Sequence, residues 1–451
     1  MKNNNLKPYS VYEYQRLTVG NPLDKKDFDA LRSFILNQED EGVNESVPFD
    51  ELKTEEAGAC MKLTANHGQE VLTVQNYVGT ILLSTGTTIE ILPKIFKSET
   101  NNESEARKLV IEMLKTCGLI SSKSFQNARI HEEKMSIFEV YIRVFLDEVF
   151  ELYKKGLKSG YEQKQENEKF FKGKLLFSQH IKHNFAHAER FFVEYEEFTV
   201  NRPENRLIKT TLAFLRGVSR VDANRRDLHR LSMIFEDVEK STHIQSDFQK
   251  CTGGRNMREY ETILSLCKIF LSGYSFSTYV GKHNTVALLF PMEKLFECYI
   301  AKKLQERLEG KGWEISTQYR GKYLFEEPKM FLLKPDIFLT SKDGKKIILD
   351  TKWKVLSNNA SEHYGISQAD MYQMYAYYHR YKVDKVMLVY PQVNLFSPLS
   401  WKVDGQEIIS AHFIPYERDK ESDDVKGFNI ENLMDAINPS TKNVTATQQH
   451  N

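Results

Sequence analysis

Two aspartates and a lysine in the last third of the chain have the residue types and the spacing of a metal-dependent active site. Asp336 stands in the stretch KPDIFL, and Asp350 and Lys352 stand in IILDTKWK, at the end of an apolar run. Side chains alternate along a strand, so Asp350 and Lys352 are expected to point to the same face. An Asp-x-Lys pair by itself is more often a plain surface ion pair, so its interpretation depends on the residues beside it.

A β-hairpin is predicted to bring the two aspartates together. Asp343 and Gly344 form a typical turn between the strand-like halves of KPDIFLTSKDGKKIILDTKWK. Pairing across this turn places Asp336 and Asp350 at the same end of the hairpin, within reach of one divalent cation. Mg²⁺ prefers carboxylate oxygens, and Thr351 is placed to add its backbone carbonyl. The sequence therefore predicts a Mg²⁺ site that includes Asp336, Asp350 and Thr351.

Four other side chains complete the candidate site. Lys352 is expected to orient or deprotonate the attacking water, or to neutralise a phosphate, because bound Mg²⁺ lowers the pKa of that water. Glu297 is predicted as a third metal ligand, since an acid within the apolar helical stretch MEKLFECYI is costly unless paired or metal-bound; Glu293, one turn earlier, is the alternative. Gln373 and Tyr377 share one helix face, where they would hold a DNA phosphate or brace the metal site.

The elements that must position these residues are expected to form a multidomain α/β protein. At 451 residues the chain is long enough for two or three domains. Residues 1–100 alternate short strand-like segments with turns and are predicted to form a β-rich module. Residues 101–285 have mainly helical periodicity, and residues 286–435 run helix, hairpin, helix and strand, the order of a compact α/β unit. The polar segment 436–451 is expected to be a disordered tail.

The composition is typical of an ordinary soluble globular protein, with 41% hydrophobic and 27% charged residues. The 62 basic and 62 acidic residues give a formal net charge of zero, which neither demands nor excludes a nucleic-acid partner. The 5 cysteines are scattered and form no CxxC pair, which indicates reduced thiols. No stretch approaches the ~18 apolar residues that a membrane span needs. We expect a cytoplasmic protein without membrane contact.

Two other motifs are disfavoured by their spacing. The nearest approach to a nucleotide-binding P-loop, GYSFSTYVGKH, has its glycines too far apart and a histidine where Ser or Thr is needed. We therefore do not expect this chain to hydrolyse a nucleoside triphosphate. His180, His183 and His187 lie near one predicted helix face, but without an HExxH motif or a nearby cysteine they are expected to be polar surface residues rather than zinc ligands.

Taken together, these stretches resemble a known family. Asp336 after proline, followed by Asp350-x-Lys352, is similar to the PD-(D/E)xK nuclease signature, and QMYAY is similar to the QxxxY extension of its RecB-like branch. Six blocks resemble the McrC family, the nuclease subunit of McrBC-type restriction systems. In chain order over roughly residues 70–395 they are IEILPKI, NRPENRLIKTTL, MEKLFECYI, KPDIFL, ILDTKWK and QADMYQMYAYY. Six blocks in order are a far more specific signal than the PD and DxK motifs alone.

The resemblance implies a C-terminal PD-(D/E)xK nuclease domain that cuts DNA with Mg²⁺ in a restriction system, a defence against phage. It also implies a separate partner, a McrB-like AAA+ NTPase whose activity the chain stimulates. Residues 1–100 are the predicted contact region for that NTPase, with Lys94 in IEILPKI the one residue considered for contact. Similar chains also occur with a cognate cytosine methyltransferase in systems that cut unmethylated sites. Dependence on methylated DNA and cutting of unmethylated sites therefore both stay open.

Two other functions fit the same residues. A non-catalytic adaptor would bind and stimulate the NTPase without cutting DNA. A standalone RecB-like repair nuclease would cut DNA without any NTPase. The complete set of acids and lysine favours an enzyme over an adaptor.

Overall fold

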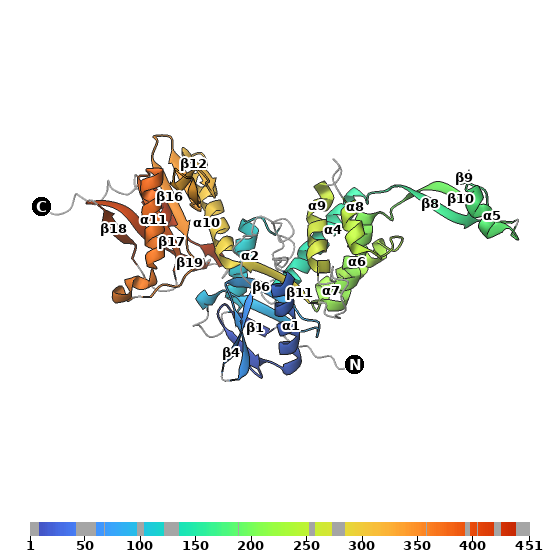
Figure 1. Cartoon of the computed structure of the whole chain (residues 1–451), viewed down its shortest axis with the longest axis horizontal. Coiled ribbons are helices and arrows are strands. Elements are labelled where there is room, and N and C mark those ends of the chain that lie inside the picture. The colour runs from blue at the N-terminus through green and yellow to red at the C-terminus, as the bar shows by residue number, and fades with distance from the viewer. Residues whose placement is uncertain are drawn as a thin grey trace. The chain divides into compact units, whose positions relative to one another are not determined.

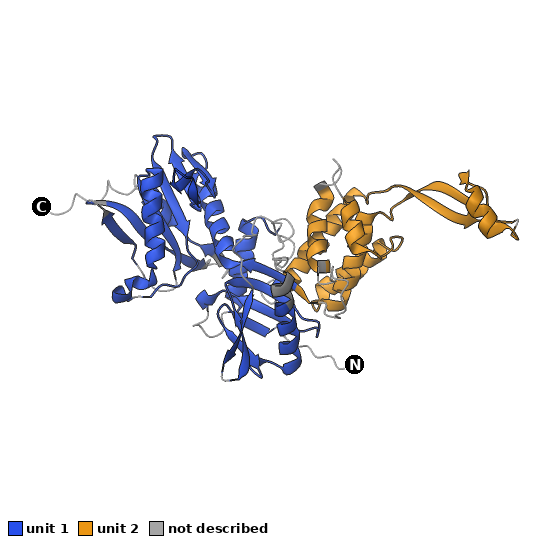
Figure 2. Cartoon of the chain, in the orientation of Figure 1, with its two compact units in different colours: residues 1–137, 287–451 blue, residues 138–286 orange. Residues whose placement is uncertain are grey.

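The computed structural model describes residues 9–41, 60–66, 68–96, 103–120, 135–187, 189–251, 258–272, 285–357, 359–392, 397–403, 405–418 and 425–438. The chain forms two compact units, one that combines residues 1–137 with 287–451 and one of residues 138–286 (Figure 2). The domain boundaries expected near residues 100 and 435 stay predictions, and the expected tail lies outside the described residues from 439 onward. No helix in the described ranges is long and apolar enough to cross a membrane.

The first unit begins with two small sheets, of strand order β3-β2-β5-β4 and β1-β7-β6-β11 (Figure 1). The strand character expected here is observed, and the structure adds a helix, α1, that was not predicted. Its buried residues Phe28, Leu31 and Ile35 do recur at helical spacing. The elements are β1 (Tyr9–Tyr12), β2 (Arg16–Val19), β3 (Pro22–Leu23), α1 (Lys25–Glu41), β4 (Met61–Asn66), β5 (Gln69–Val74), β6 (Tyr77–Leu82), β7 (Thr88–Leu92), η2 (Lys94–Phe96) and α2 (Glu103–Thr116).

A glycine allows β6 to pack closely against β11 (Val286–Pro291), the strand on which the chain returns to the first unit. Gly79 has φ +134°, and a Cβ there would lie 2.0 Å from the carbonyl oxygen of Leu288, so no other residue fits without moving the backbone. Strand β11 runs directly into helix α10 (Met292–Leu308). The N-terminal sheet therefore holds the start of the helix that carries a predicted metal ligand.

The second unit consists of helices and a long extension built on the three-stranded sheet β8-β10-β9 (Figure 1). The helices agree with the periodicity, but the strands of the extension were not predicted, because β8 is polar and partly exposed along its whole length. The rings of His180 and His183 stack on Phe191 and Phe192, which gives these two histidines a packing role. The elements are α4 (Ile137–Lys155), β8 (Gly160–Glu168), β9 (Lys174–Leu175), α5 (Phe177–Asn184), β10 (Phe191–Thr199), α6 (Pro203–Val218), α7 (Asp222–Ile234), α8 (Ile244–Lys250) and α9 (Arg258–Ser272).

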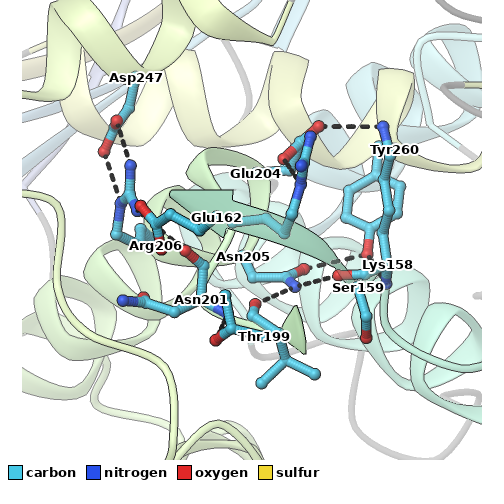
Figure 3. A network of polar contacts seen from close by, with 12 residues as sticks. Lys158, Ser159, Glu162, Thr199, Asn201, Glu204, Asn205, Arg206, Asp247 and Tyr260 are labelled. Carbon is cyan, nitrogen blue, oxygen red and sulfur yellow. Dashed lines mark hydrogen bonds and ion pairs between the residues drawn. The ribbon is translucent and has the colours of Figure 1, made fainter. Parts of the chain in front are cut away.

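A polar network joins the base of this extension to the helices (Figure 3). Asn205 on α6 donates to the main-chain oxygens of Lys158 at 3.0 Å and Val200 at 2.7 Å. The Tyr260 hydroxyl donates to the Asn205 amide oxygen at 3.0 Å. Arg206, the next residue of α6, forms an ion pair with an aspartate of α8 at 2.8 Å. The polar residues of the NRPENRLIKTTL block therefore anchor the extension to the helices.

The candidate site belongs to a mixed sheet of order β12-β15-β16-β17-β19-β18, with β20 paired to β19. β15 and β16 are antiparallel, β16 and β17 are parallel, and helix α11, which connects this parallel pair, lies across the sheet (Figure 1). Helix, hairpin, helix and strand follow in the predicted order. The elements are β12 (Trp313–Thr317), β13 (Lys322–Phe325), β14 (Met330–Leu333), β15 (Ile337–Ser341), β16 (Lys346–Thr351), η4 (Ala360–Gly365), α11 (Gln368–Tyr381), β17 (Lys385–Gln392), β18 (Leu399–Val403), β19 (Gln406–Arg418), β20 (Val425–Phe428) and α12 (Glu431–Ile437).

Candidate active site

The predicted hairpin forms, and it brings the two aspartates to one end. Ile337 of β15 pairs with Leu349 of β16, and the next step of this register sets Asp336 opposite Asp350. Thr351 donates to Asp336 Oδ2 from its backbone nitrogen at 2.8 Å and from its hydroxyl at 2.9 Å. Thr351 thus orients a carboxylate, a contact that the sequence reading did not include. Its carbonyl as a metal ligand stays a prediction.

Asp350 is buried between the positive charge of Lys352 and the negative charge of Asp336. Its carboxylate Oδ2 lies 2.7 Å from Lys352 Nζ, yet this oxygen has no well-directed hydrogen-bond donor among the described residues. Burial, followed by the negative charge of Asp336, raises the pKa of Asp350 to about 7 against the opposing pull of Lys352. A buried acid in this state gains most from a cation that neutralises it.

Lys352 lies among three acceptors. Its Nζ is 2.7 Å from Asp350 and 3.7 Å from Asp370, and it donates to the Gln373 amide oxygen at 3.1 Å. Burial alone lowers the pKa of Lys352, but the surrounding carboxylates outweigh it and raise the pKa above its ordinary value. The side chain is therefore held as a cation. This charge state favours orienting the water or neutralising a phosphate over deprotonating the water.

Gln373 and Tyr377 brace the lysine. Gln373 accepts from Lys352 with its oxygen and donates from Nε2 to the Tyr377 hydroxyl at 3.0 Å, and that hydroxyl donates to the Lys334 carbonyl at 3.0 Å. Tyr377 is 1% exposed, and burial raises the pKa of its hydroxyl. The chain of hydrogen bonds joins α11 to the strand end that carries Asp336. Two roles were predicted for Gln373 and Tyr377, holding a DNA phosphate or bracing the metal site. The observed contacts correspond to the second role, with Lys352 as the residue that is braced.

Glu297 is placed by helix α10, and the structure favours it over Glu293, which is exposed. Its carboxylate pairs with Lys294 at 2.6 Å and accepts a hydrogen bond from the Gln318 amide. Burial, followed by the charge of Asp336, raises the pKa of Glu297. An influence of Asp336 on both Glu297 and Asp350 indicates that the three acids share one electrostatic environment.

Asp370 is a site residue that the sequence reading missed. It is buried near the start of α11, where its backbone nitrogen donates to the Ser367 hydroxyl at 3.1 Å. Its carboxylate pairs with Lys354 at 2.7 Å and lies 3.7 Å from Lys352. The Ser-x-x-Asp spacing of a helix start was a signal that could have drawn attention to it.

The three predicted metal ligands fit a hard divalent cation by their chemistry. Glu297, Asp336 and Asp350 supply carboxylate oxygens, the donors that Mg²⁺ prefers, and Asp350 offers a buried oxygen without a directed donor. In the described ranges no group of three or more His, Cys, Asp and Glu side chains is gathered closely enough to hold a metal ion. Each of the three acids instead contacts protein donors, chiefly Lys294, Thr351 and Lys352.

Comparisons with known proteins agree with this fold. A model of the family "McrBC 5-methylcytosine restriction system component" matches residues 72–391. A chain in a half-complex from a tetradecameric assembly of Thermococcus gammatolerans McrB AAA+ hexamers with bound McrC has a TM-score of 0.66 at 19% identity, over 91% of this chain and 95% of that one. A chain in the Thermococcus gammatolerans McrBC complex gives a TM-score of 0.48 at 20% identity, over 67% and 88%. No curated protein matches.

The likeness to the first of these structures shows a shared fold across nearly the whole chain. The family match begins in the N-terminal sheets and ends in β17, so it spans the second unit and every predicted site residue. It covers well over half of the sequence. The protein belongs to the McrBC 5-methylcytosine restriction system component family.

Proposed function

We propose that this chain is the DNA endonuclease subunit of a restriction system, which hydrolyses phosphodiester bonds with Mg²⁺ in complex with a McrB-like AAA+ NTPase. The observation that carries the proposal is the convergence of Asp336, Asp350 and Lys352 at one end of the β15–β16 hairpin. Family membership supports the restriction role.

The acids would hold the metal ion. Glu297, Asp336 and Asp350 are the proposed ligands, and a bound Mg²⁺ supplies a water of lowered pKa and positive charge next to the phosphate. Thr351 orients Asp336 through two hydrogen bonds. With its pKa raised to about 7, Asp350 is protonated in part of the molecules near neutral pH, and cation binding would displace that proton.

Lys352 would act on the scissile phosphate or on the attacking water. Its ammonium is fixed by Asp350 and by Gln373, which Tyr377 in turn holds. A preorganised cation stabilises the negative charge that develops on the phosphate oxygens without reorganising during the reaction. The neighbouring Asp370 adds a carboxylate that keeps the lysine protonated.

An AAA+ NTPase is proposed as the partner. The solved assembly of similar fold contains McrB AAA+ hexamers with bound McrC, and the sequence of this chain contains no P-loop of its own. Residues 1–100 are the proposed contact region. The chain would stimulate the NTPase, and the complex would act on DNA.

The Lys352→Ala variant of the full chain, assayed with its NTPase partner, tests this proposal. We expect DNA cleavage to fall by about 100-fold or more, because the phosphate loses a preorganised cation, while stimulation of the NTPase persists. Both activities are measured in the same reaction. Unchanged cleavage would contradict the assignment of Lys352, and cleavage by the unaltered chain without any NTPase would favour a standalone nuclease.

A further inference from the structure

Trp353 directly follows Lys352, and its side chain is buried where β16 ends. The indole is 1% exposed and packs against Phe296 of α10 and Phe428 of β20, with ring centroids 5.2 Å and 6.2 Å away. The position of this ring therefore constrains the backbone on the C-terminal side of the proposed catalytic lysine.

Two residues just past strand ends of the β1-β7-β6-β11 sheet hold Trp353 by polar contacts. The Glu13 carboxylate, at the end of β1, accepts from the indole Nε1 at 2.9 Å and 3.2 Å, and from the backbone nitrogen of Lys94 at 2.9 Å. The Lys94 ammonium donates to the Trp353 carbonyl oxygen at 2.7 Å. Lys94 was the one residue considered for contact with the partner, and that contact stays a prediction; in the structure its ammonium has an internal acceptor.

This arrangement is costly to build, which argues for a specific role. Glu13 is fully buried, and burial raises its pKa to about 7 against the opposing pull of Lys94. Apolar residues of similar volume would fill the same space without the desolvation penalty of two charges. What the polar contacts add over apolar packing is a fixed orientation of the Trp353 ring and of its main-chain carbonyl.

The fixed points lie on both sides of Lys352. The Lys352 backbone nitrogen donates to the Val389 carbonyl of β17 at 2.9 Å, and its carbonyl accepts from the Lys354 nitrogen at 2.9 Å. Trp353, between these contacts, is fixed by the N-terminal sheet. The Lys352 Nζ lies only 2.7 Å from Asp350 and 3.1 Å from the Gln373 oxygen. A shift of the backbone at Trp353 would move Lys352 with it and break these short contacts.

We propose that Glu13 and Lys94 are positioning residues for the nuclease site, which hold Trp353 so that Lys352 stays aimed at Asp350 and Gln373. This inference rests on the proposed function. It gives the N-terminal sheet a task inside the active site, in addition to any contact with a partner.

The test uses three variants of the full chain in complex with the NTPase. Glu13→Gln removes the charge, Trp353→Phe keeps an aromatic ring but removes the indole donor, and Lys94→Met removes the ammonium. We expect each to lower the single-turnover cleavage rate at saturating DNA by about 10- to 100-fold, as a small misplacement of a catalytic group does, with DNA affinity unchanged. Lys94→Arg, which can still donate to the Trp353 carbonyl, should recover most of the rate.

A matched control separates positioning from general stability. Glu90 of β7 is another fully buried acid of the same sheet, but it binds Arg107 and the backbone nitrogen of Ile137 and does not contact Trp353. Glu90→Gln should lower the unfolding temperature without changing the cleavage rate of the folded protein. Because Glu13→Gln replaces one of the two oxygens that accept from the indole and Trp353→Phe removes the indole donor, both act on the same contact, and the double variant should cleave no more slowly than the slower single variant.

The inference is overturned if the folded Trp353→Phe and Lys94→Met variants cleave at the unaltered rate, if Lys94→Arg gives no recovery, or if Glu90→Gln loses as much rate. Should Glu13→Gln fail to fold, the Trp353→Phe and Lys94 variants decide the question. Asp350→Asn in the same assay separates the two claims. If Asp350→Asn cleaves normally, the proposed function fails; if it is inactive while the Trp353 and Lys94 variants are fully active, only the positioning role fails.

Discussion

At the scale of single residues, the site is a set of charges that constrain one another. Asp350 is buried beside Asp336, so its pKa rises to about 7, and Lys352 is kept cationic by the carboxylates around it. The sequence predicted that Asp336 and Asp350 come together at one end of a hairpin, because hairpin pairing is a local property. It did not predict Asp370 as a neighbour of Lys352, since that contact depends on how α11 packs over the strand.

Buried His412 of β19 makes a pH-dependent contribution to the stability of the sheet that carries the candidate site. Burial lowers the pKa of His412 from 6.5 to about 4, and its Nε2 lies 2.9 Å from the Ser410 hydroxyl. Below the unfolded pKa the unfolded chain binds a proton that the folded chain does not, so the stability contribution is present above that pKa and is lost as the pH falls toward the folded value. From about pH 7.5 to about pH 5 this amounts to about 2 kcal/mol.

His412→Asn should therefore lower the unfolding free energy at pH 7.5 relative to pH 5 by about 2 kcal/mol compared with the unaltered chain, in which buried Glu13 and Asp350 titrate with the opposite sign. Urea unfolding at the two pH values, followed by tryptophan fluorescence, measures the difference in the free energy of unfolding. The same substitution at His229, which is exposed in the second unit, controls for the loss of a histidine. A His412→Asn protein that keeps the full pH dependence of the unaltered chain would show that another group is responsible.

At the scale of elements, helix α11 links the lysine to the start of the hairpin. Its core residues Met374, Tyr377 and Tyr381 are buried against β17 and its neighbours, which fixes the helix over the sheet. From that position the Tyr377 hydroxyl reaches the Lys334 carbonyl, and the Tyr381 hydroxyl reaches that of Leu333 at 2.8 Å. The QxxxY spacing predicted the shared face, but which groups it would contact depended on tertiary packing.

Tyr377→Phe tests the brace. The substitution keeps the ring and removes the hydroxyl, so Gln373 loses an acceptor and the Lys334 carbonyl loses a donor. We expect about a 10-fold fall in cleavage rate, equivalent to about 1.4 kcal/mol, the scale of one buried hydrogen bond. Tyr375→Phe on the exposed side of the same helix is the control and should cleave normally. Equal cleavage rates for the two variants would show that the Tyr377 hydroxyl does not contribute to the site.

At the scale of the whole molecule, the sequence predicted local elements better than long-range partners. The hairpin, α10 and α11 each carry their signal within a few residues, whereas the contact of Glu13 with Trp353 joins residues 340 positions apart. Strand β8 carried little signal because its residues are polar along both faces, and pairing with β10 decides its structure. Such contacts are set by tertiary packing, which no local periodicity encodes.

The chain also returns to its first unit through β11, so residues far apart in sequence share one compact body (Figure 2). The two N-terminal sheets and the sheet that carries the candidate site belong to this unit, and the Trp353 contacts are made within it. We therefore expect loss of the N-terminal sheet to impair cleavage as well as any binding of the partner.

Cleavage of plasmid DNA by the complete complex with Mg²⁺, comparing Asp350→Asn with Asp343→Asn, tests the central claim most directly. Both substitutions neutralise an aspartate of the same hairpin, but Asp343 lies exposed at the turn, away from Asp336 and Lys352. The account predicts that Asp350→Asn lowers the cleavage rate by at least about 100-fold while stimulation of the partner NTPase persists, and that Asp343→Asn cleaves normally. Normal cleavage by the Asp350→Asn complex would contradict the account.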